Sequence, residues 1–474
     1  MGSPLLSADK LRYVYLELTS RCNLRCVYCP QSQSFFKDRV DFPRDRLPEL
    51  IQDFKKGAIH YVRVSGIGET TILKDWMEIC EAILSAGLDL EIVSNLAKKL
   101  SPEEIRMLCR FKRIYVSFDT TDSVVFAQLR RHASLDQVLD NLKQIVAFSK
   151  SQDEYKPYLL LSLVVNDKVI FQIEKTLFDA IELGIDEIFI NDMRQYPDVE
   201  DALQVRPFWT LPLDQVHLGK RMLESAVASA RGSGIITNVT PGLTQNIENA
   251  IQHPGEIKAN ENSFCSSIGS CTTPPGAGET RFCLDPWDAA VINADGSVSP
   301  CCLFPVVDGN IHDHTINEIL AGDVAANLRH ELLTGQLSTH CATCNLRGVT
   351  SLQELTKAVR SRLFANTKDL LPSIINPLVP TWKNKRVLIY GAGAHTSTLF
   401  NKTQIIEAHP IGIVDKNAQN LAPSMSGVPI YPIDAIESLN PDVIVISSFA
   451  YQEEIAQYLQ QCVSTGIEII KIYA

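Results

Sequence analysis

Alternating strand-like and helix-like segments fill the first half of the sequence, and they constrain the fold more than any other feature. Strand-like runs occur at 13–19, 60–65, 89–94, 113–119, 158–165 and 187–191. Helical periodicity fits 73–86, 102–110, 134–149, 168–183 and 213–231. Six strands that alternate with helices across short connections predict an α/β fold with parallel strands, a partial (β/α)6 TIM-like barrel over 11–240. In such barrels functional side chains gather where the strands end.

Three cysteines follow the first strand. Cys22, Cys26 and Cys29 have C-x3-C-x2-C spacing. Three thiolates on a short loop converge on one metal centre, but structural zinc and iron–sulfur cubanes normally take four protein ligands. The spacing therefore predicts a metal centre with one open coordination position, which is where chemistry takes place.

This cysteine loop, with Tyr28 as the aromatic residue of C-x3-C-x-aromatic-C, resembles the signature of the radical S-adenosylmethionine (SAM) enzymes. The resemblance implies a 4Fe–4S cluster on Cys22, Cys26 and Cys29, with SAM bound through its amino and carboxylate groups to the fourth iron. It further implies reductive cleavage of SAM to a 5′-deoxyadenosyl radical, hydrogen abstraction from a substrate, and an external one-electron reductant of the flavodoxin or ferredoxin type.

The later strand ends offer candidate SAM contacts. The second strand runs into Gly66, Ile67, Gly68 and Glu69, where glycines permit close backbone approach and a carboxylate can accept from an ammonium group. The family's Gly-Gly-Glu-type motif occupies this place, although Ile67 separates the glycines. The resemblance adds these cofactor-binding candidates: Tyr28, Ser94, Asn95, Ser117, Asp119, Arg130 (with Arg131 as second choice) and Asn166. Strand-end capping is the alternative role of Ser94, Asn95, Ser117 and Asn166.

A second metal site is predicted from Cys283, Cys301, Cys341 and Cys344, arranged as C-x17-C…C-x2-C around a hairpin-like run at 289–299 and a helix at 316–333. Spacing alone allows structural zinc. However, Asp-Gly-x-Val-x-x-Cys…Gly-Asn-Ile…Cys-x-x-Cys resembles the SPASM/twitch extension of radical SAM enzymes, which holds auxiliary 4Fe–4S clusters. No cysteine lies between Cys344 and Cys462, so we expect the shorter twitch form with one closed, electron-transferring cluster. Cys302 is the alternative ligand to Cys301.

The region 234–282 breaks the alternation and is rich in Asn, Ser, Gly and Pro. We interpret it as a long excursion, a lid or substrate loop. Cys265 and Cys271 lie in it and are candidates for a catalytic hydrogen-donor role, for cluster ligation, or for inert core thiols.

A second α/β unit is expected near the C-terminus. A strand at 386–390 enters Gly391-Ala392-Gly393, and the next strand ends at Asp415. This pattern fits a Rossmann-type nucleotide site, in which a phosphate binds at a helix N-terminus and the acidic residue binds the ribose. Thr396 replaces the third glycine of that motif. The segment resembles small Rossmann-like domains appended to sugar-modifying acyltransferases and methyltransferases. Gly391, Gly393 and Asp415 are thus candidates for binding a nucleotide or nucleotide-sugar, and a docking module is the alternative.

Length and composition agree with this organisation. The 474 residues divide into a barrel (11–240), a lid insertion (241–282), a twitch-like cysteine-rich extension (283–350), a Pro-containing linker (351–383) and a Rossmann-like domain (384–474). A net charge of −11 argues against a nucleic-acid partner, and no apolar run reaches membrane-spanning length. Thirteen cysteines without a secretory signal favour the reducing cytoplasm.

The leading hypothesis is a radical SAM oxidoreductase acting on a small molecule, namely a sugar, a cyclitol or a nucleotide-linked compound. The auxiliary cluster would accept the electron of the substrate radical. One alternative is an epimerase in which Cys265, Cys271 or Cys302 returns hydrogen. Others are a peptide maturase, ranked lower because no leader-binding domain is seen ahead of the barrel, and a binding protein with an inert cluster.

Overall fold

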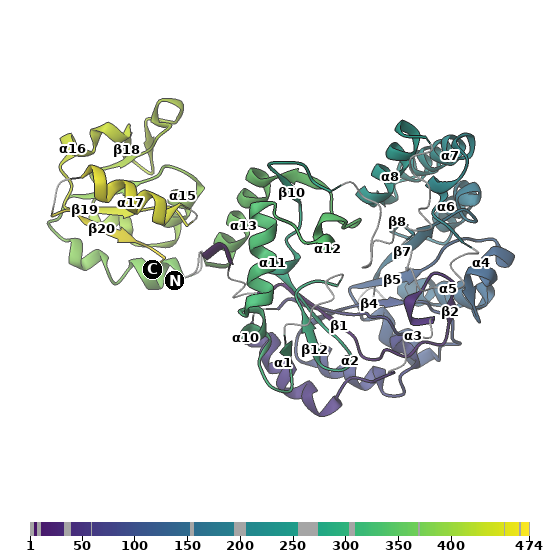
Figure 1. Cartoon of the computed structure of the whole chain (residues 1–474). Helices are drawn as coiled ribbons and strands as arrows, with labels where there is room; N and C mark the ends of the chain where they lie inside the picture. The colour runs from purple at the N-terminus through teal and green to yellow at the C-terminus, as the bar shows by residue number, and fades with distance from the viewer. Residues whose placement is uncertain are drawn as a thin grey trace. The chain divides into compact units, whose positions relative to one another are not determined.

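The computed structural model describes residues 4–6, 11–32, 39–57, 59–151, 156–193, 205–254, 274–302, 309–367, 370–449, 451–463 and 466–473. The chain separates into two compact units, Met1–Leu355 and Thr356–Ala474, each with its own sheet (Figure 1). Within the described ranges, no helix combines the length and the apolar character needed to cross a membrane.

Parallel strands form the centre of the first unit's sheet. In sheet order they are β1 (Tyr13–Leu16), β3 (Tyr61–Val64), β4 (Asp89–Ser94), β5 (Arg113–Ser117), β7 (Tyr158–Val165), β8 (Glu187–Asp192) and β9 (Ile236–Val239). The helices along its outer side are α1 (Leu47–Lys56), α2 (Trp76–Ser85), α3 (Pro102–Cys109), α4 (Ser123–Leu129), α5 (Leu135–Ser151), α6 (Ile173–Glu182), α7 (Leu213–Gly232) and α8 (Pro241–Gln252) (Figure 1). The predicted α/β architecture is confirmed.

Two parts of this unit differ from the sequence prediction. Helix α1 lies in a stretch that had no assignment. Strand β9 and helix α8 continue the alternation to Gln252, so the predicted irregular excursion is wrong over this part. Pro241 reads as a breaker in sequence, but it occupies the first turn of α8, where a missing N–H costs nothing. Cys265 and Cys271 lie outside the described residues.

The two faces of this sheet differ sharply. Val14, Val62 and Val116 are fully buried beneath the outer helices. Tyr15, Arg63 and the other residues that alternate with them retain partial exposure on the inner face. The inner face is therefore polar and aromatic, unlike the packed apolar interior of a closed barrel.

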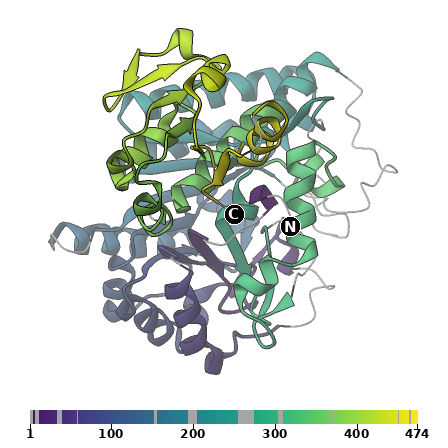
Figure 2. The same cartoon turned by 90° about the vertical axis from the view of Figure 1, so that its left-hand side faces the viewer.

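A cysteine-rich segment extends the same sheet at the edge next to β1 (Figures 1 and 2). Strand β11 (Ala289–Ile292) pairs in parallel with β1, and β12 (Ser297–Ser299) returns antiparallel, which confirms the predicted hairpin. The predicted helix at 316–333 is two helices, α10 (Ile316–Leu320) and α11 (Asp323–Thr334), because Gly322 takes an extended conformation between them. The remaining elements are α9 (Asp285–Asp288), α12 (Thr339–Ala342), β13 (Gly309–Asn310) and the pair β10 (Glu279–Arg281) with β14 (Val349–Ser351).

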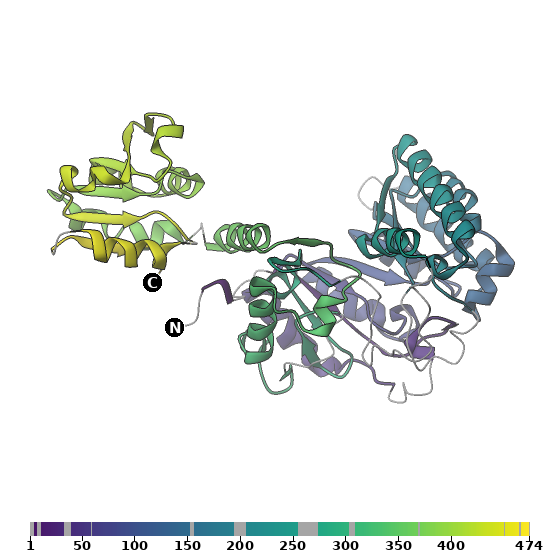
Figure 3. The same cartoon turned by 45° about the horizontal axis from the view of Figure 1, so that its top comes forward.

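The second unit is a doubly wound α/β sheet. Its strand order is β17 (Ser424–Met425), β18 (Val428–Tyr431), β16 (Gly412–Val414), β15 (Val387–Tyr390), β19 (Val443–Ile446) and β20 (Glu468–Lys471), parallel from β18 onward. Helices α14 (Leu371–Ile375) and α15 (Ala394–Lys402) pack on one face, and α16 (Ile436–Leu439) and α17 (Gln452–Cys462) on the other (Figure 3).

The segment expected to be a linker is largely structured. Helix α13 (Leu352–Thr367) precedes α14, and Leu371, Ile375 and Trp382 are buried in the core of the second unit. The prolines that suggested a tether lie at helix starts, at Pro372 in α14 and Pro380 in a short 3-10 turn, where a proline is well tolerated.

Candidate functional site

The predicted three-cysteine loop folds back on itself after β1. Its strand β2 (Arg25–Cys26) pairs antiparallel with β6 (Arg130–Arg131), which places Cys26 opposite Arg130. The N–H of Cys29 donates to the Cys26 carbonyl at 3.1 Å and closes a turn. Burial, and further the nearby thiols, raise the pKa of Cys22 to about 11 and that of Cys26 to about 12. The loop therefore brings the three cysteines close together, with Cys26 buried and Cys22 and Cys29 partly exposed.

This donor set fits an iron–sulfur cluster. Buried thiols of raised pKa ionise when they ligate a cation, which stabilises the thiolate. The backbone N–H of Leu24 and the side-chain amide of Asn95 approach the Cys22 sulfur at 3.4 and 3.8 Å, as donors to a cluster sulfur do. The Arg130 guanidinium lowers the pKa of Cys26 against the effect of burial.

Glu69 connects the ends of two strands beside this loop. Its carboxylate is buried, accepts from the Ser94 hydroxyl at 2.8 Å and from the Asn95 N–H at 2.7 Å. The Asn95 amide in turn donates to the Asn23 side chain at 2.9 Å. The structure thus brings Glu69, Ser94 and Asn95, three of the candidate SAM contacts, together next to Cys22.

The two glycines of this motif are required by packing. A Cβ on Gly68 would lie 2.1 Å from the Thr19 carbonyl oxygen, and one on Gly66 would lie 2.3 Å from the Glu17 side chain. Both glycines therefore allow the loop after β3 to pack against the chain that leads into the cysteines. Glu17, which sequence reasoning missed, accepts from the N–H groups of Ile67 at 2.6 Å and Ala294 at 3.1 Å.

Asp119 contacts two of the other predicted residues, Tyr28 and Arg130. Its fully buried carboxylate accepts from the Tyr28 hydroxyl and, at 2.9 and 3.0 Å, from two nitrogens of Arg130. The Arg130 side chain, expected to meet the SAM carboxylate, is thus a bidentate partner of Asp119. Ser117 ends β5 next to Ser162 of β7. Asn166 is buried with its amide oxygen accepting from the N–H groups of Lys168 and Val169, which is the strand-end cap that the sequence left as its alternative role.

An array of charged and aromatic side chains, the inner-face array, covers the inside of the sheet and was missed from the sequence. The Arg63 guanidinium lies 5.2 and 4.3 Å from the ring centroids of Tyr15 and Tyr115 and pairs with Glu91 at 2.6 Å. Arg113 lies over the Tyr158 ring at 4.6 Å. Burial raises the pKa of Tyr15, and Asp285 and Cys302 raise it further, so Tyr15 lies near the second cysteine set.

That second set surrounds one cavity. It is lined by Cys283, Cys301, Cys302, Cys341 and Cys344, together with Arg281, Asp285 and Arg347. Burial, and then the Cys301 and Cys344 thiols, raise the pKa of Cys341 to about 12, so these sulfurs also lie close together and suit a cluster. Both Cys301 and Cys302 line the cavity. Within the described ranges, no group of three or more His, Cys, Asp or Glu side chains is arranged to hold a single metal ion.

Two arginines, the buried Arg281 and the partly exposed Arg347, shape this cavity. Arg281 donates to the carbonyl oxygens of Cys341 at 3.3 Å and Arg347 at 3.2 Å, which fixes the loop carrying two of the cysteines. Arg347 contacts both carboxylate oxygens of Asp285 at 2.7 Å, and Tyr13 donates to Asp285 at 2.9 Å.

The two cysteine sets lie at opposite ends of β1. Cys22 follows the C-terminal end of β1, whereas Cys283 precedes β11, whose first residue Ala289 pairs with Tyr13 at the N-terminal end. Cys301 follows β12, which runs back toward the same end. The inner-face array lies on the strands that connect the two ends.

The predicted C-terminal residues also share a pocket. Gly391, Gly393 and Asp415 line a pocket of about 640 Å³ in the second unit.

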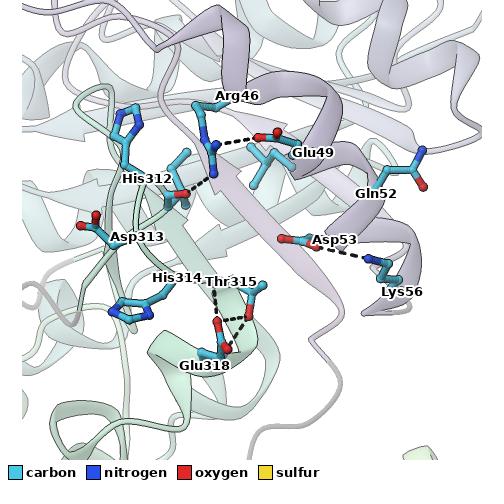
Figure 4. A pocket seen from close by; sticks show the side chains of 12 residues that line it. Arg46, Glu49, Gln52, Asp53, Lys56, His312, Asp313, His314, Thr315 and Glu318 are labelled. Carbon is cyan, nitrogen blue, oxygen red and sulfur yellow. Dashed lines mark hydrogen bonds and ion pairs between the residues drawn. The ribbon is translucent and has the colours of Figure 1, made fainter.

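A separate groove lies outside all of these sites (Figure 4). It has a volume of about 460 Å³ and runs between α1 and the segment 311–318. Part of its polar lining is internally paired: Arg46 with Glu49 at 2.7 Å, and Thr315 with Glu318 in a helix cap. It holds none of the predicted site residues.

Family models match three stretches of the chain. A model described as the radical SAM superfamily matches residues 16–151, and a SPASM model, described as an iron–sulfur cluster-binding domain, matches 283–345. Residues 383–472 match a C2185-like N-terminal domain, so the expected Rossmann-like relationship is not confirmed by this comparison.

Characterised relatives are distant. The chain is 24% identical over 186 residues to a tungsten-containing aldehyde ferredoxin oxidoreductase cofactor-modifying protein of Pyrococcus furiosus, covering 39% of this chain and 52% of the relative. It is 34% identical over 138 residues to a GTP 3′,8-cyclase of Limosilactobacillus fermentum, covering 27% and 40%. A GTP 3′,8-cyclase of Paracoccus denitrificans matches at 25% identity over 62% of this chain and 82% of its own. The chain thus spans about half the length, or less, of the first two relatives.

Among solved structures, Streptococcus suis SuiB bound to S-adenosylmethionine is similar in fold. The TM-score is 0.51 at 14% identity, covering 71% of this chain and 72% of SuiB. At this identity the likeness concerns the fold alone.

Proposed function

We propose that this chain, which carries a radical SAM domain followed by a SPASM iron–sulfur domain, is an enzyme that oxidises a polar small molecule. The two domains imply 4Fe–4S clusters and SAM as its cofactors. Its substrate class in this proposal is a sugar, a cyclitol or a nucleotide-linked compound. The observation that carries the proposal is the inner-face array, placed between the two cysteine sets.

Different residues of the chain would hold the two clusters and SAM. Cys22, Cys26 and Cys29 would hold the SAM-binding cluster, and Cys283, Cys301, Cys341 and Cys344 the auxiliary one. Glu69, held by Thr71, Ser94 and Asn95, would accept from the SAM amino group at Oε2, because within the described residues Oε2 accepts only from the Asn95 N–H whereas Oε1 already accepts from Thr71 and Ser94. When bound, SAM with its cluster supplies a hydrogen-abstracting radical, and the auxiliary cluster supplies a one-electron acceptor.

The inner-face array suits a substrate rich in oxygen. The Tyr15 hydroxyl accepts from Arg63 at 3.4 Å and keeps its own hydrogen to donate to a substrate oxygen, whereas the Tyr115 hydroxyl donates to Glu91 at 3.4 Å. The flat tyrosine rings would pack against the face of a sugar or cyclitol ring. Oxidation of a secondary alcohol to a carbonyl releases the hydroxyl proton, and we assign Glu91 as its acceptor. Glu91 lies within the array and is oriented by Arg63 at 2.6 Å.

The test is anaerobic reconstitution of the full chain with counting of iron and zinc. Two cubanes require about eight irons per chain, and Cys26→Ala and Cys341→Ala should each reduce this to about four. With dithionite and SAM, the wild type should form 5′-deoxyadenosine and Cys26→Ala should not. About four irons with one zinc, or no 5′-deoxyadenosine from fully loaded protein, contradicts the proposal.

A second candidate function is the radical rearrangement of a nucleotide without net oxidation. The match to a GTP 3′,8-cyclase over 82% of that protein favours it, as do the cations Arg63 and Arg113 on the inner face. Product mass separates the possibilities: oxidation removes two hydrogens from the substrate and rearrangement removes none. Solvent deuterium in an unoxidised product would instead support epimerisation.

A further inference from the structure

The second unit has a pocket at the point where the strand order of its sheet reverses direction. Gly391, Asp415 and Ser447 line this pocket of about 640 Å³, and each directly follows a parallel strand, β15, β16 and β19 respectively. The chain proceeds from central β15 to β16 and β18 on one side and to β19 and β20 on the other. Open α/β sheets bind ligands in the crevice at such a reversal, beyond the carboxyl ends of the strands.

A helix N-terminus opens into this pocket. The nine-residue helix α15 begins after Gly393, which makes no side-chain cap. Gly393 has extended backbone angles that any residue can adopt, and a Cβ built on it meets nothing within 4 Å. Uncapped N–H groups at a helix N-terminus bind anions, and the space above Gly393 is open to one.

Buried polar groups without partners line the same pocket. Tyr390 is 4% exposed, and its hydroxyl has no hydrogen-bond partner among the described residues. Burial raises the pKa of Tyr390 to about 12, so this hydroxyl remains a donor at neutral pH. The Nε of Arg360 is likewise buried without a partner in the described part of the chain. Buried donors of this kind require an explanation, and a ligand acceptor supplies one.

Two further titratable groups of the pocket, Asp415 and His395, are engaged or neutral. The Asp415 carboxylate accepts from the N–H groups of Ala392 at 2.7 Å and Asn417 at 2.8 Å. His395 contacts Ser447 and Tyr473, and burial lowers its pKa to about 4, so it is uncharged at pH 7. Asp415 therefore holds the glycine turn in shape, which leaves the helix terminus, Tyr390, Arg360 and Lys416 to meet a ligand.

An aromatic surface lies at the edge of the pocket. The Arg360 guanidinium lies 3.7 Å from the ring centroid of Tyr451, and its ion pair with Glu454 measures 4.0 Å. Tyr451 remains 48% exposed, so its ring is available for stacking, and Phe449 lines the pocket nearby. An anion site next to aromatic rings fits a ligand that joins phosphate to a flat base.

We propose that this pocket binds a nucleoside diphosphate, free or attached to a sugar. Its phosphates lie at the N-terminus of α15 above Gly393, with the Tyr390 hydroxyl and Arg360 as donors. Its base lies against Tyr451 and Phe449. The site is formed within the second unit alone and does not depend on the proposed oxidation chemistry.

Calorimetric titration of the full chain with UDP, GDP, ADP, UDP-glucose and inorganic pyrophosphate tests the proposal. At least one nucleoside diphosphate should bind about tenfold or more tightly than pyrophosphate, since stacking of the base adds on the order of 1 kcal/mol or more. Tighter binding of UDP-glucose than of UDP would identify the sugar-linked form as the ligand, and the reverse would identify the free form. The proposal is wrong if no nucleotide binds below about 1 mM, or if pyrophosphate binds equally well.

Two variants separate ligand binding from folding. Gly393→Asp should weaken binding about tenfold or more, because it places a carboxylate where the phosphate lies, yet thermal stability should hold or rise because Asp is a good helix N-cap. Tyr390→Phe should weaken binding several-fold without loss of stability, because it removes a buried hydroxyl that the free protein leaves unpaired.

Ser397→Asp is the matched control for charge. It adds the same carboxylate to α15 at an exposed residue that does not line the pocket, so binding should change much less than in Gly393→Asp. Equal affinity of Gly393→Asp and the wild type would overturn the proposal, whatever the stability of the variant.

Discussion

Among single residues, Glu17 links the two cysteine-bearing parts of the first unit. It is 6% exposed at the end of β1, and it accepts from Ile67, in the loop that leads to Glu69, and from Ala294, in the hairpin turn before Cys301. A carboxylate suits this place because both partners are N–H donors. Burial raises the pKa of Glu17, and these same hydrogen bonds offset that effect only in part.

Glu17→Gln should therefore weaken SAM binding and lower the unfolding temperature. The Gln side chain replaces one acceptor oxygen by an NH2 group, which leaves one backbone N–H unpaired at a cost of about 1–3 kcal/mol. Isothermal titration with SAM and a thermal melt measure the two effects. Glu49→Gln, at a side chain that is 64% exposed, is the control and should change neither. Unchanged SAM affinity in Glu17→Gln would show that Glu17 does not hold the SAM loop.

Among the elements, the buried carboxylate of Asp192 connects three: β8, the 3-10 turn at Phe208–Thr210 and α8. Asp192 accepts from the Trp209 indole at 3.0 Å and from the Asn246 amide at 2.7 Å. Burial raises the pKa of Asp192 from 3.8 to about 6 in spite of these bonds. Since the charged form is disfavoured in the folded state, the stability that Asp192 contributes is complete below pH 4 and is lost as the pH rises through 6.

Asp192→Asn should therefore alter the pH dependence of folding. The wild type loses roughly 3 kcal/mol between pH 4 and 7 through this group, and the variant, which cannot ionise there, does not. The unfolding temperature of Asp192→Asn relative to wild type should be higher at pH 7 than at pH 4.5. A difference that is the same at both pH values would mean that Asp192 keeps an ordinary pKa.

The loop that carries Cys341 and Cys344 depends on Arg281 of β10. Arg281→Gln cannot reach the same carbonyl oxygens, so the loop should lose its fixed shape and the auxiliary cluster its ligands. Reconstituted Arg281→Gln should hold about four irons per chain and still form 5′-deoxyadenosine. Retention of about eight irons would show that the cysteines are positioned without the hydrogen bonds that Arg281 donates.

At the scale of the molecule, the sequence predicts local features of the chain but misses contacts that depend on which residues of neighbouring strands pair. The spacing of Cys22, Cys26 and Cys29, and the order of strands and helices, are visible over short windows. The Tyr13–Asp285 hydrogen bond joins residues 272 positions apart, and it follows from the pairing of β1 with β11. The inner-face array was missed for a related reason. Arg63 lies in a short, mostly apolar strand, so the sequence does not show which face of the sheet it occupies. In the structure the helices cover the opposite face, which places Arg63 on the inner face.

The separate cores of the two units predict that they lose structure independently. Trp382 and Trp287 are both 1% exposed, one in each unit. Truncation of either to Ala costs about 3–5 kcal/mol through the cavity that it leaves. Trp382→Ala should lower the temperature at which the second unit unfolds in calorimetry, and it should abolish nucleotide binding. Iron content and 5′-deoxyadenosine formation should stay at wild-type levels.

Trp287→Ala should show the reverse pattern. Trp287 directly follows Asp285 and Pro286, which line the auxiliary cavity, and its indole donates to the Leu5 carbonyl at 2.7 Å within the first unit. Iron content should therefore fall, and the transition of the second unit should be unmoved. If Trp382→Ala lowered iron content as far as Trp287→Ala does, the two units would fold as one cooperative body, and the pocket beside α15 would be energetically coupled to the cysteine sites.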